Sequence, residues 1–147
     1  MSVYSSKILE LSTNIKNIGR GINKSDPNYS TSHKVSKICG SEITLEIIFN
    51  RENEIVEDFS INPKACALGQ ASASILSHHI IGASAAEIFK ARDDLKKILK
   101  ENGPLPEGRF WEIRYLEPIS EYPSRHASTM LAWEAACAAL EGIGIKP

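Results

Sequence analysis

The sequence has little cysteine, methionine or aromatic content, and it contains no long hydrophobic run. Three cysteines in 147 residues are too few for the disulfide framework of a small secreted domain. No apolar stretch approaches the roughly 20 residues that span a bilayer, which argues against a transmembrane helix. Seventeen basic residues stand against eighteen acidic ones, so no positive surplus indicates a nucleic-acid or anionic-membrane partner.

The N-terminus has no basic segment followed by an apolar one, so we expect no secretory signal and a cytoplasmic location. In that reducing compartment thiols serve metal binding or chemistry more often than structural disulfides. The length suits one domain, residues 1–147, that buries a core without disulfides or a structural metal.

Hydrophobic spacing predicts the order of elements. Apolar residues at steps of three and four from Tyr4 to Ile18 indicate a first helix, which the glycines at 19 and 21 end. Residues 22–32 are polar and are expected to form a loop, and residues 33–38 a short edge strand. Alternation and branched side chains predict a hairpin of Ile43–Phe49 and Glu54–Ile61, with its turn at 50–53.

Helices dominate the second half of the sequence. One is expected over Leu68–Ile81, and a second begins at a capping box formed by Ser84 and Glu87 and ends at Asn102. A proline-containing connection, with a short helical piece around 110–116, leads to a last helix over Ser128–Glu141, for which Ser128 is a good N-cap. This order predicts an α+β fold with helices packed on one face of a small antiparallel sheet.

Two cysteines bracket the predicted hairpin and are the strongest functional signal. Cys39 precedes the first strand and is followed by glycine, which leaves the backbone open to close approach. Cys66 stands at the start of a helix, where free amides stabilise a thiolate. A hairpin returns the chain to its origin, so the two thiols are expected to face each other in a metal or sulfur site. The alternative is that each is a small buried hydrophobe.

Other candidate ligands are weaker. Cys137 lies in mid-helix, facing away from Ser128, and is expected to pack in the core. His78 and His79 diverge on their helix and are not a chelating pair. His126, just before the last helix, could reach the two thiols, although an exposed histidine is the commoner case.

Four motifs in order resemble one family. The segments Tyr4-Ser-Ser-Lys-Ile and Asn14-Ile-Lys-Asn-Ile-Gly look like its first helix, and Cys39-Gly-Ser stands where it has Cys-Gly-Asp. Cys66 with Ala71-Ser-Ala-Ser looks like its second cysteine and helix. The stretch from Tyr122-Pro-Ser-Arg to Trp133 is similar to aromatic-Pro-x-Arg-x-x-Cys-x-x-Leu-x-Trp. The family is that of the U-type iron–sulfur cluster scaffold proteins, the IscU/NifU N-terminal fold, and especially its SufU branch.

The resemblance implies three antiparallel strands with packed helices, and three cysteines and an aspartate that converge on a transient iron–sulfur cluster or a zinc ion. It implies a cysteine desulfurase, other assembly proteins and apo-protein acceptors as partners, and a monomer or weak homodimer. This sequence departs from the pattern twice, because Ser41 stands at the aspartate position and Ser128 at the third cysteine. A neutral serine hydroxyl is a poor ligand, so His126, Glu42, water or a second subunit would have to complete a four-ligand site.

The sequence therefore predicts a scaffold or carrier, not an enzyme, that binds iron, an iron–sulfur cluster or zinc through Cys39 and Cys66, with Ser41, His126 and Ser128 as weaker candidates. One alternative is a degenerate, metal-free module that docks assembly proteins. Another is a thiol redox protein in which Cys39 and Cys66 form a reversible disulfide.

Overall fold

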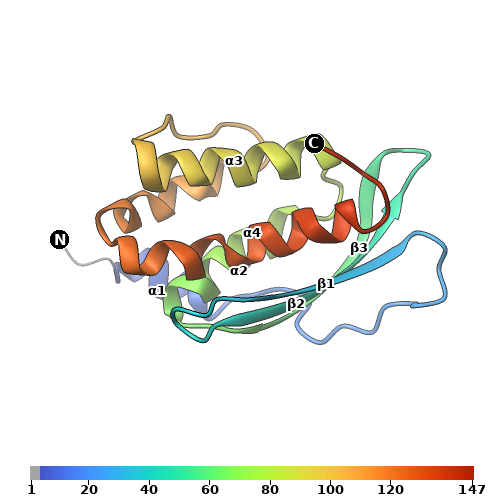
Figure 1. The fold of residues 1–147 in the computed structure, drawn as a ribbon, viewed down its shortest axis with the longest axis horizontal. Coiled ribbons are helices and arrows are strands. Elements are labelled where there is room, and N and C mark those ends of the chain that lie inside the picture. Colours follow the sequence, from blue (N-terminus) through green and yellow to red (C-terminus); the bar gives the residue numbers. More distant parts are fainter. Residues whose placement is uncertain (1–3) are drawn as a thin grey trace.

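Alternating branched residues build the sheet that supports the whole molecule. The computed structural model describes residues 4–147, and in it Ile43, Leu45 and Ile47 of the central strand all turn inward and are buried. Helices cover that inner face in layers (Figure 1). The elements are α1 Ser6–Ser12, β1 Tyr29–Val35, β2 Glu42–Asn50, β3 Ile55–Lys64, α2 Ala67–His79, α3 Ala85–Glu101, the 3₁₀ helices η1 Trp111–Glu121 and η2 Pro123–Arg125, and α4 His126–Glu141.

The three strands run antiparallel in the order β1-β2-β3, which confirms the α+β expectation. Leu45 of β2 lies opposite Ser32 of β1 and Ile61 of β3. A bulge between Ile48 and Phe49 shifts the register near the hairpin turn. Because β2 is central, its backbone pairs with β1 on one side and with β3 on the other. Its position therefore determines where the start of β2 and the end of β3 lie.

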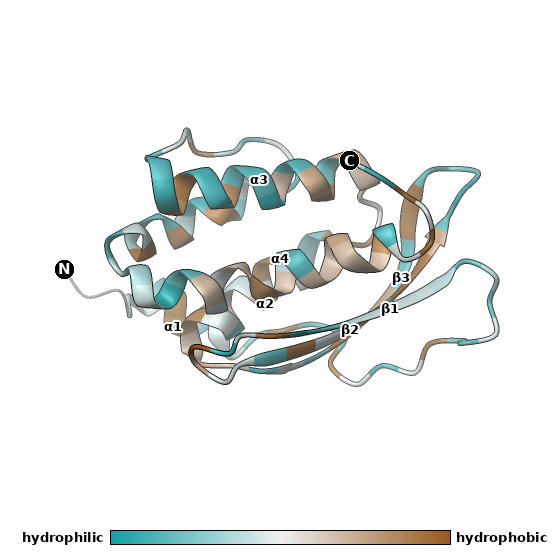
Figure 2. Ribbon diagram, in the orientation of Figure 1, coloured by the Kyte–Doolittle hydropathy of each residue, from teal (hydrophilic) through white to brown (hydrophobic). Residues whose placement is uncertain are grey.

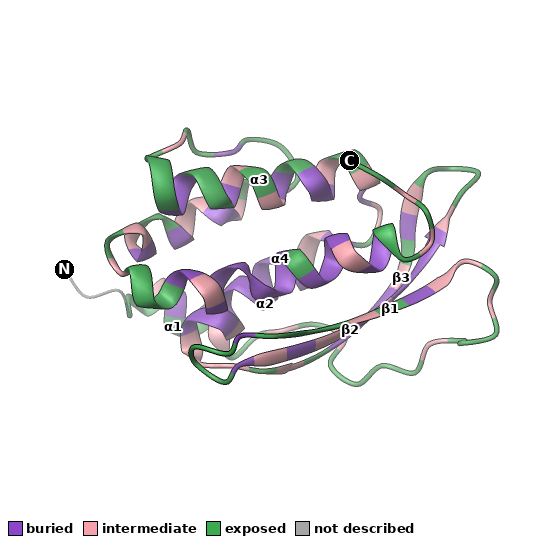
Figure 3. Ribbon diagram, viewed as in Figure 1, coloured by how far each residue is buried: buried purple, intermediate pink, exposed green. Residues whose placement is uncertain are grey.

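Helices α2 and α4 form the layer next to the sheet, and α3 lies over α4 (Figure 1). Twelve of the sixteen residues of α4 are buried (Figure 3), as expected for a helix that is apolar around most of its circumference. The outer helix α3 carries hydrophilic residues on its outer side (Figure 2). Hydroxyl groups join these elements. Ser30 Oγ of β1 donates to the Ala139 carbonyl of α4 at 2.6 Å, and Trp133 Nε1 of α4 donates to Ser72 Oγ of α2 at 2.8 Å.

The first helix is shorter than the hydrophobic stripe predicts. It ends at Ser12, and the chain then runs beside β3, where Ile18 forms a bridge with Ile61. Asn17 adopts a left-handed conformation (φ 61°), and its side-chain amide donates to the Phe59 carbonyl at 3.0 Å. Hydrogen bonds to residues distant in the sequence therefore end α1 before Gly19 and Gly21, which were expected to end it.

Two further boundaries differ from expectation. The edge strand begins at Tyr29, not at 33, because Ser30 and Ser32 turn hydroxyls rather than apolar groups toward α4 and so hide the strand pattern. The last helix begins at His126, so Ser128 lies inside its first turn and is not its N-cap. Its Oγ atom lies 3.5 Å from the Arg125 carbonyl oxygen.

Other expectations are confirmed. In the capping box, Glu87 N donates to Ser84 Oγ at 3.1 Å and Ser84 N to Glu87 Oε1 at 2.9 Å. Asn102 ends α3 in a left-handed conformation. The short helical piece is present but is a 3₁₀ helix that extends through Pro118 to Glu121. Among residues 4–147, no helix is both long and apolar enough to cross a membrane.

Candidate functional site

One end of the sheet brings together the turn before β2, the start of α2 and the start of α4. The pairing of Glu42 with Lys64 places the residues before β2 beside those after β3. The turn carries Cys39, and Cys66 is the N-cap residue of α2. The hairpin thus returns the second thiol to the end of the sheet that holds the first.

Cys39 lies exposed on a tight turn. The turn is closed by the amide of Ser36 donating to the Ser41 carbonyl at 2.8 Å and by the amide of Gly40 donating to the Ser36 carbonyl at 2.8 Å. Gly40 adopts φ +72°, a conformation that favours glycine. This geometry holds the thiol at the surface, with Cys39 Sγ 3.2 Å from Ser41 Oγ.

Two hydroxyls favour the thiolate of Cys39. Hydrogen bonding from Ser36, and then from Ser41, lowers the pKa of Cys39, and this outweighs the opposing effect of partial burial. Ser36 Oγ is buried and has no other hydrogen-bond partner among the described residues. A thiolate at Cys39 supplies an acceptor for that hydroxyl, so Ser36 favours the ionised form. Nothing in the residue spacing indicated this role for Ser36.

Cys66 faces Ser128 across the contact between α2 and α4. Their Sγ and Oγ atoms are 3.3 Å apart, and Ser128 is buried. Gly69 makes the contact possible, because a Cβ there would lie 3.2 Å from the Ser128 carbonyl oxygen and 2.9 Å from the Ala65 Cβ. The sequence alone does not show that Gly69 lies against the Ser128 carbonyl.

Each thiol therefore has a serine hydroxyl as its neighbour, Ser41 for Cys39 and Ser128 for Cys66. These are the two positions at which the resemblance predicts an aspartate and a third cysteine. Within the described part of the chain, no three His, Cys, Asp or Glu side chains come close enough to hold a metal ion. The donor set of one chain, two thiols and two neutral hydroxyls, does not fit a cluster that needs four thiolate-type ligands.

His126 is buried, and its Nε2 atom lies 3.1 Å from the Ile119 carbonyl and 3.2 Å from that of Ser120. This nitrogen therefore acts as a donor that ties η1 to α4, and it is not free to bind a metal. Of the two alternatives for His126, exposure is therefore wrong, because the residue is buried. A role as a ligand stays a prediction and would fall to Nδ1.

The remaining cysteine and histidines have structural partners. Cys137 is buried as expected, and burial raises its pKa to about 12. His78 Nε2 lies 2.7 Å from the Asn14 carbonyl, and His79 Nε2 lies 2.6 Å from Glu112 Oε1. They support the packing of α2 and take no part in the thiol site.

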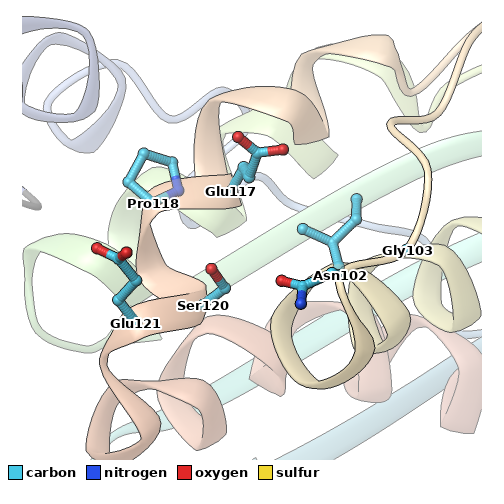
Figure 4. A pocket seen from close by; sticks show the side chains of 7 residues that line it. Asn102, Gly103, Glu117, Pro118, Ser120 and Glu121 are labelled. Atoms are coloured by element: carbon cyan, nitrogen blue, oxygen red, sulfur yellow. The ribbon is translucent and has the colours of Figure 1, made fainter.

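Two cavities are lined by residues other than Cys39 and Cys66. One of about 370 Å³ separates the end of α3, at Asn102 and Gly103, from the η1 residues Glu117, Pro118, Ser120 and Glu121 (Figure 4). Another of about 400 Å³ lies between α3 and α4, with Lys96, Lys100 and Ile38 in its lining. Ile38 connects this second cavity to the Cys39 turn, which the sequence did not reveal.

The family model described as "NifU-like N terminal domain" matches residues 3–142. The chain belongs to this family. Its NifU-like relatives include the "Iron-sulfur cluster assembly scaffold protein IscU" of Thermotoga maritima, 32% identical over 105 residues, which are 71% of this chain and 72% of that protein. A protein of the same name from Streptococcus pyogenes is 25% identical and is matched over 66% of this chain and 60% of its own length.

Solved structures agree on the NifU-like fold. A nitrogen-fixing NifU-like protein (N-terminal) from Brucella abortus superposes with a TM-score of 0.89 at 41% identity, covering 96% of this chain and 94% of that one. A putative SUF-system scaffold from Fervidobacterium islandicum superposes with a TM-score of 0.81 at 23% identity, over 94% and 96% of the two chains, and supports the fold alone.

Proposed function

We propose that this protein is a scaffold or carrier in iron–sulfur cluster assembly, and not a turnover enzyme, and that Cys39 and Cys66 bind its iron, cluster or zinc cargo. The observation that carries the proposal is the arrangement of these thiols at one end of the sheet, one on an exposed turn and the other at a helix start. Membership in a family whose relatives are named scaffold proteins supports it.

The two residues supply the kind of ligand that this cargo needs, although one chain offers two of them and not four. Thiolate sulfur is a soft ligand that binds iron in clusters and zinc in tetrahedral sites. The hydroxyls of Ser36 and Ser41 lower the pKa of Cys39, so its ligating form is available closer to neutral pH. Exposure of Cys39 gives an incoming or departing cargo a route to the site.

The scaffold role implies partners that deliver sulfur and receive the product. We infer a cysteine desulfurase, other assembly proteins and apo-protein acceptors in the cytoplasm, where the three free cysteines would stay reduced. The exposed turn around Cys39 is the part of the site that such partners would approach first.

Anaerobic reconstitution tests the proposal. Wild-type protein treated with ferrous iron and sulfide, or with zinc alone, is expected to retain metal after desalting, measured by metal analysis and visible absorption. Cys39→Ser and Cys66→Ser should each lose most of it, whereas Cys137→Ala, which changes a buried cysteine away from the site, should keep it. Equal retention by all four proteins, or none by the wild type, would refute the assignment and leave a metal-free docking module.

A further inference from the structure

The cavity of about 400 Å³ between α3 and α4 has a lining that suits a ligand of its own. Its volume is within the range of pockets that hold small organic molecules. The C-terminal end of α3 lies over the N-terminal end of α4, so the two helices run in opposite directions along the cavity (Figure 1). Its lining runs from Arg92 to Lys100 on α3 and from His126 to Glu134 on α4, which is about 12 Å of each helix.

One side of this cavity is apolar. Met130 and Ala127 of α4 line it, and Ile38 joins them from the turn that carries Cys39. Ile38 is 79% exposed, the largest exposed fraction among the large apolar residues of the described chain. An apolar body in the cavity would contact these side chains and remove the surface of Ile38 from water, which is favourable. The ring of His126 forms a fixed wall, because its Nε2 atom contacts two carbonyls of η1.

The charges of the lining are separated along the cavity. Lys96 and Lys100 lie one turn apart on the same face of α3, and neither forms an ion pair within residues 4–147. Arg92, by contrast, is paired with Asp93 at 3.1 Å. At that end of the cavity Glu134 supplies a carboxylate that is also unpaired in the described chain. One end therefore attracts a negative charge and the other repels it.

We propose that this cavity binds a small organic monoanion, namely a carboxylate attached to an unbranched apolar chain. The carboxylate lies between the ammonium groups of Lys96 and Lys100, and the chain lies on Met130 and Ile38. Glu134 disfavours a second negative charge at the far end of the ligand. No covalent bond is made or broken. The site is separate from the two thiols and does not depend on the proposed scaffold function.

Titration of the full chain with octanoate, followed by NMR of the methyl groups of Met130 and Ile38, tests the proposal. We expect shifts at both methyl groups that saturate. Acetate, which lacks the apolar chain, and octylammonium, which carries the opposite charge, should not produce them. Octanedioate, with a carboxylate at each end, should bind at least several-fold more weakly than octanoate because one carboxylate would face Glu134.

Matched variants identify the contacts. Lys96→Glu and Lys100→Glu should each weaken octanoate binding at least several-fold, whereas Lys97→Glu, the same change of charge on α3 outside the cavity lining, should not. Ile38→Ser should also weaken binding, and Val35→Ser, at another exposed apolar residue outside the lining, should leave it unchanged. These side chains are exposed, so the variants are expected to keep the fold, which the remainder of each NMR spectrum checks.

Three results would overturn the proposal. The first is the absence of saturable shifts with octanoate at either methyl group. The second is binding of octan-1-ol as tight as that of octanoate, because the ammonium groups would then play no part. The third is an equal loss of affinity in Lys97→Glu and Lys96→Glu, since it would reveal a general effect of surface charge and no defined site.

Discussion

A serine hydroxyl lies beside each of the two site cysteines. Ser41 and Ser128 are the nearest polar partners of Cys39 and Cys66, and Ser36 adds a buried hydroxyl whose oxygen has no other partner in the described chain. A hydroxyl stabilises a thiolate by donating to it but does not replace it as a ligand. The serines at positions 41 and 128 therefore leave two sulfur ligands in place and supply neither of the other two ligands that the resemblance predicts.

At the residue scale, Ser36→Ala should raise the pKa of Cys39 toward its ordinary value. Because the thiolate is the nucleophile, the pH midpoint of iodoacetamide alkylation should rise, and the rate at neutral pH should fall by up to about tenfold for one pKa unit. Site-resolved mass spectrometry of the alkylated protein across a range of pH measures both the midpoint and the rate. Ser60→Ala, at another buried hydroxyl without a partner, is the control and should leave the Cys39 profile unchanged. An unshifted midpoint in Ser36→Ala would contradict the assignment.

At the scale of elements, the close contact between the starts of α2 and α4 determines the geometry around Cys66. The contact depends on the absence of a side chain at Gly69, since a Cβ would approach the Ser128 carbonyl oxygen and the Ala65 Cβ too closely. Both helices are buried along most of their length, so neither can shift freely to make room.

Gly69→Ala should therefore destabilise the protein by about 1–3 kcal/mol, the usual cost of overpacking, despite the higher helix propensity of alanine. It should also weaken metal retention by moving Cys66 relative to Ser128. Urea denaturation measures the first effect and metal analysis the second. Gly21→Ala is the matched control, because a Cβ there meets no atom within 4 Å. Stability in Gly69→Ala equal to that of the control would argue against a rigid contact.

The sequence predicts those elements whose signals are local. The hairpin and the capping box of α3 follow from alternation and from Ser84 and Glu87, which are neighbours in the chain. The end of α1 and the start of β1 depend on Asn17 and Ser30, whose hydrogen bonds reach residues 42 and 109 positions away. A local sequence pattern contains no information about such distant partners. It therefore predicts the end of α1 and the start of β1 at the wrong residues.

The same distinction applies to the site. Cys39 and Cys66 stand out in the sequence because each lies at the boundary of an element. Ser36 and Gly69 do not, because their roles come from a buried hydroxyl and from a contact between two helices. The sequence also could not show that His126 turns its Nε2 toward backbone carbonyls, since those acceptors lie in a 3₁₀ helix whose extent depends on packing.

At the scale of the whole molecule, α4 is the central helix that contacts β1, β2, α2 and α3. Cys137 lies within it, with Sγ 4.0 Å from the Ile88 carbonyl oxygen, and burial raises its pKa from 9.0 to about 12. Because this buried thiol resists ionisation in the folded protein, the free energy of unfolding is expected to depend on pH in the alkaline range.

The sign follows from proton binding. Below pH 9 the thiol is protonated in both states, whereas between pH 9 and about 12 the unfolded chain loses the proton and the folded chain keeps it. Wild type should therefore lose stability relative to Cys137→Ala as pH rises through that window, by up to about 1.4 kcal/mol per pH unit. Chemical denaturation of both proteins at pH 8, 9 and 10 measures the difference. A constant offset between them would show that Cys137 ionises freely in the folded state.

The order of the strands has a consequence for how this protein behaves at high concentration. β1 is an outer strand, and no other strand in residues 4–147 pairs with its free side. An open strand edge is a template for pairing with other chains, and natural proteins discourage such growth with short edges and charged side chains. Here the protection is a seven-residue strand that carries His33 and Lys34 on its exposed half. Replacing Lys34 with an apolar residue would therefore turn this edge into a starting point for aggregation, and crystallisation or storage would show it first.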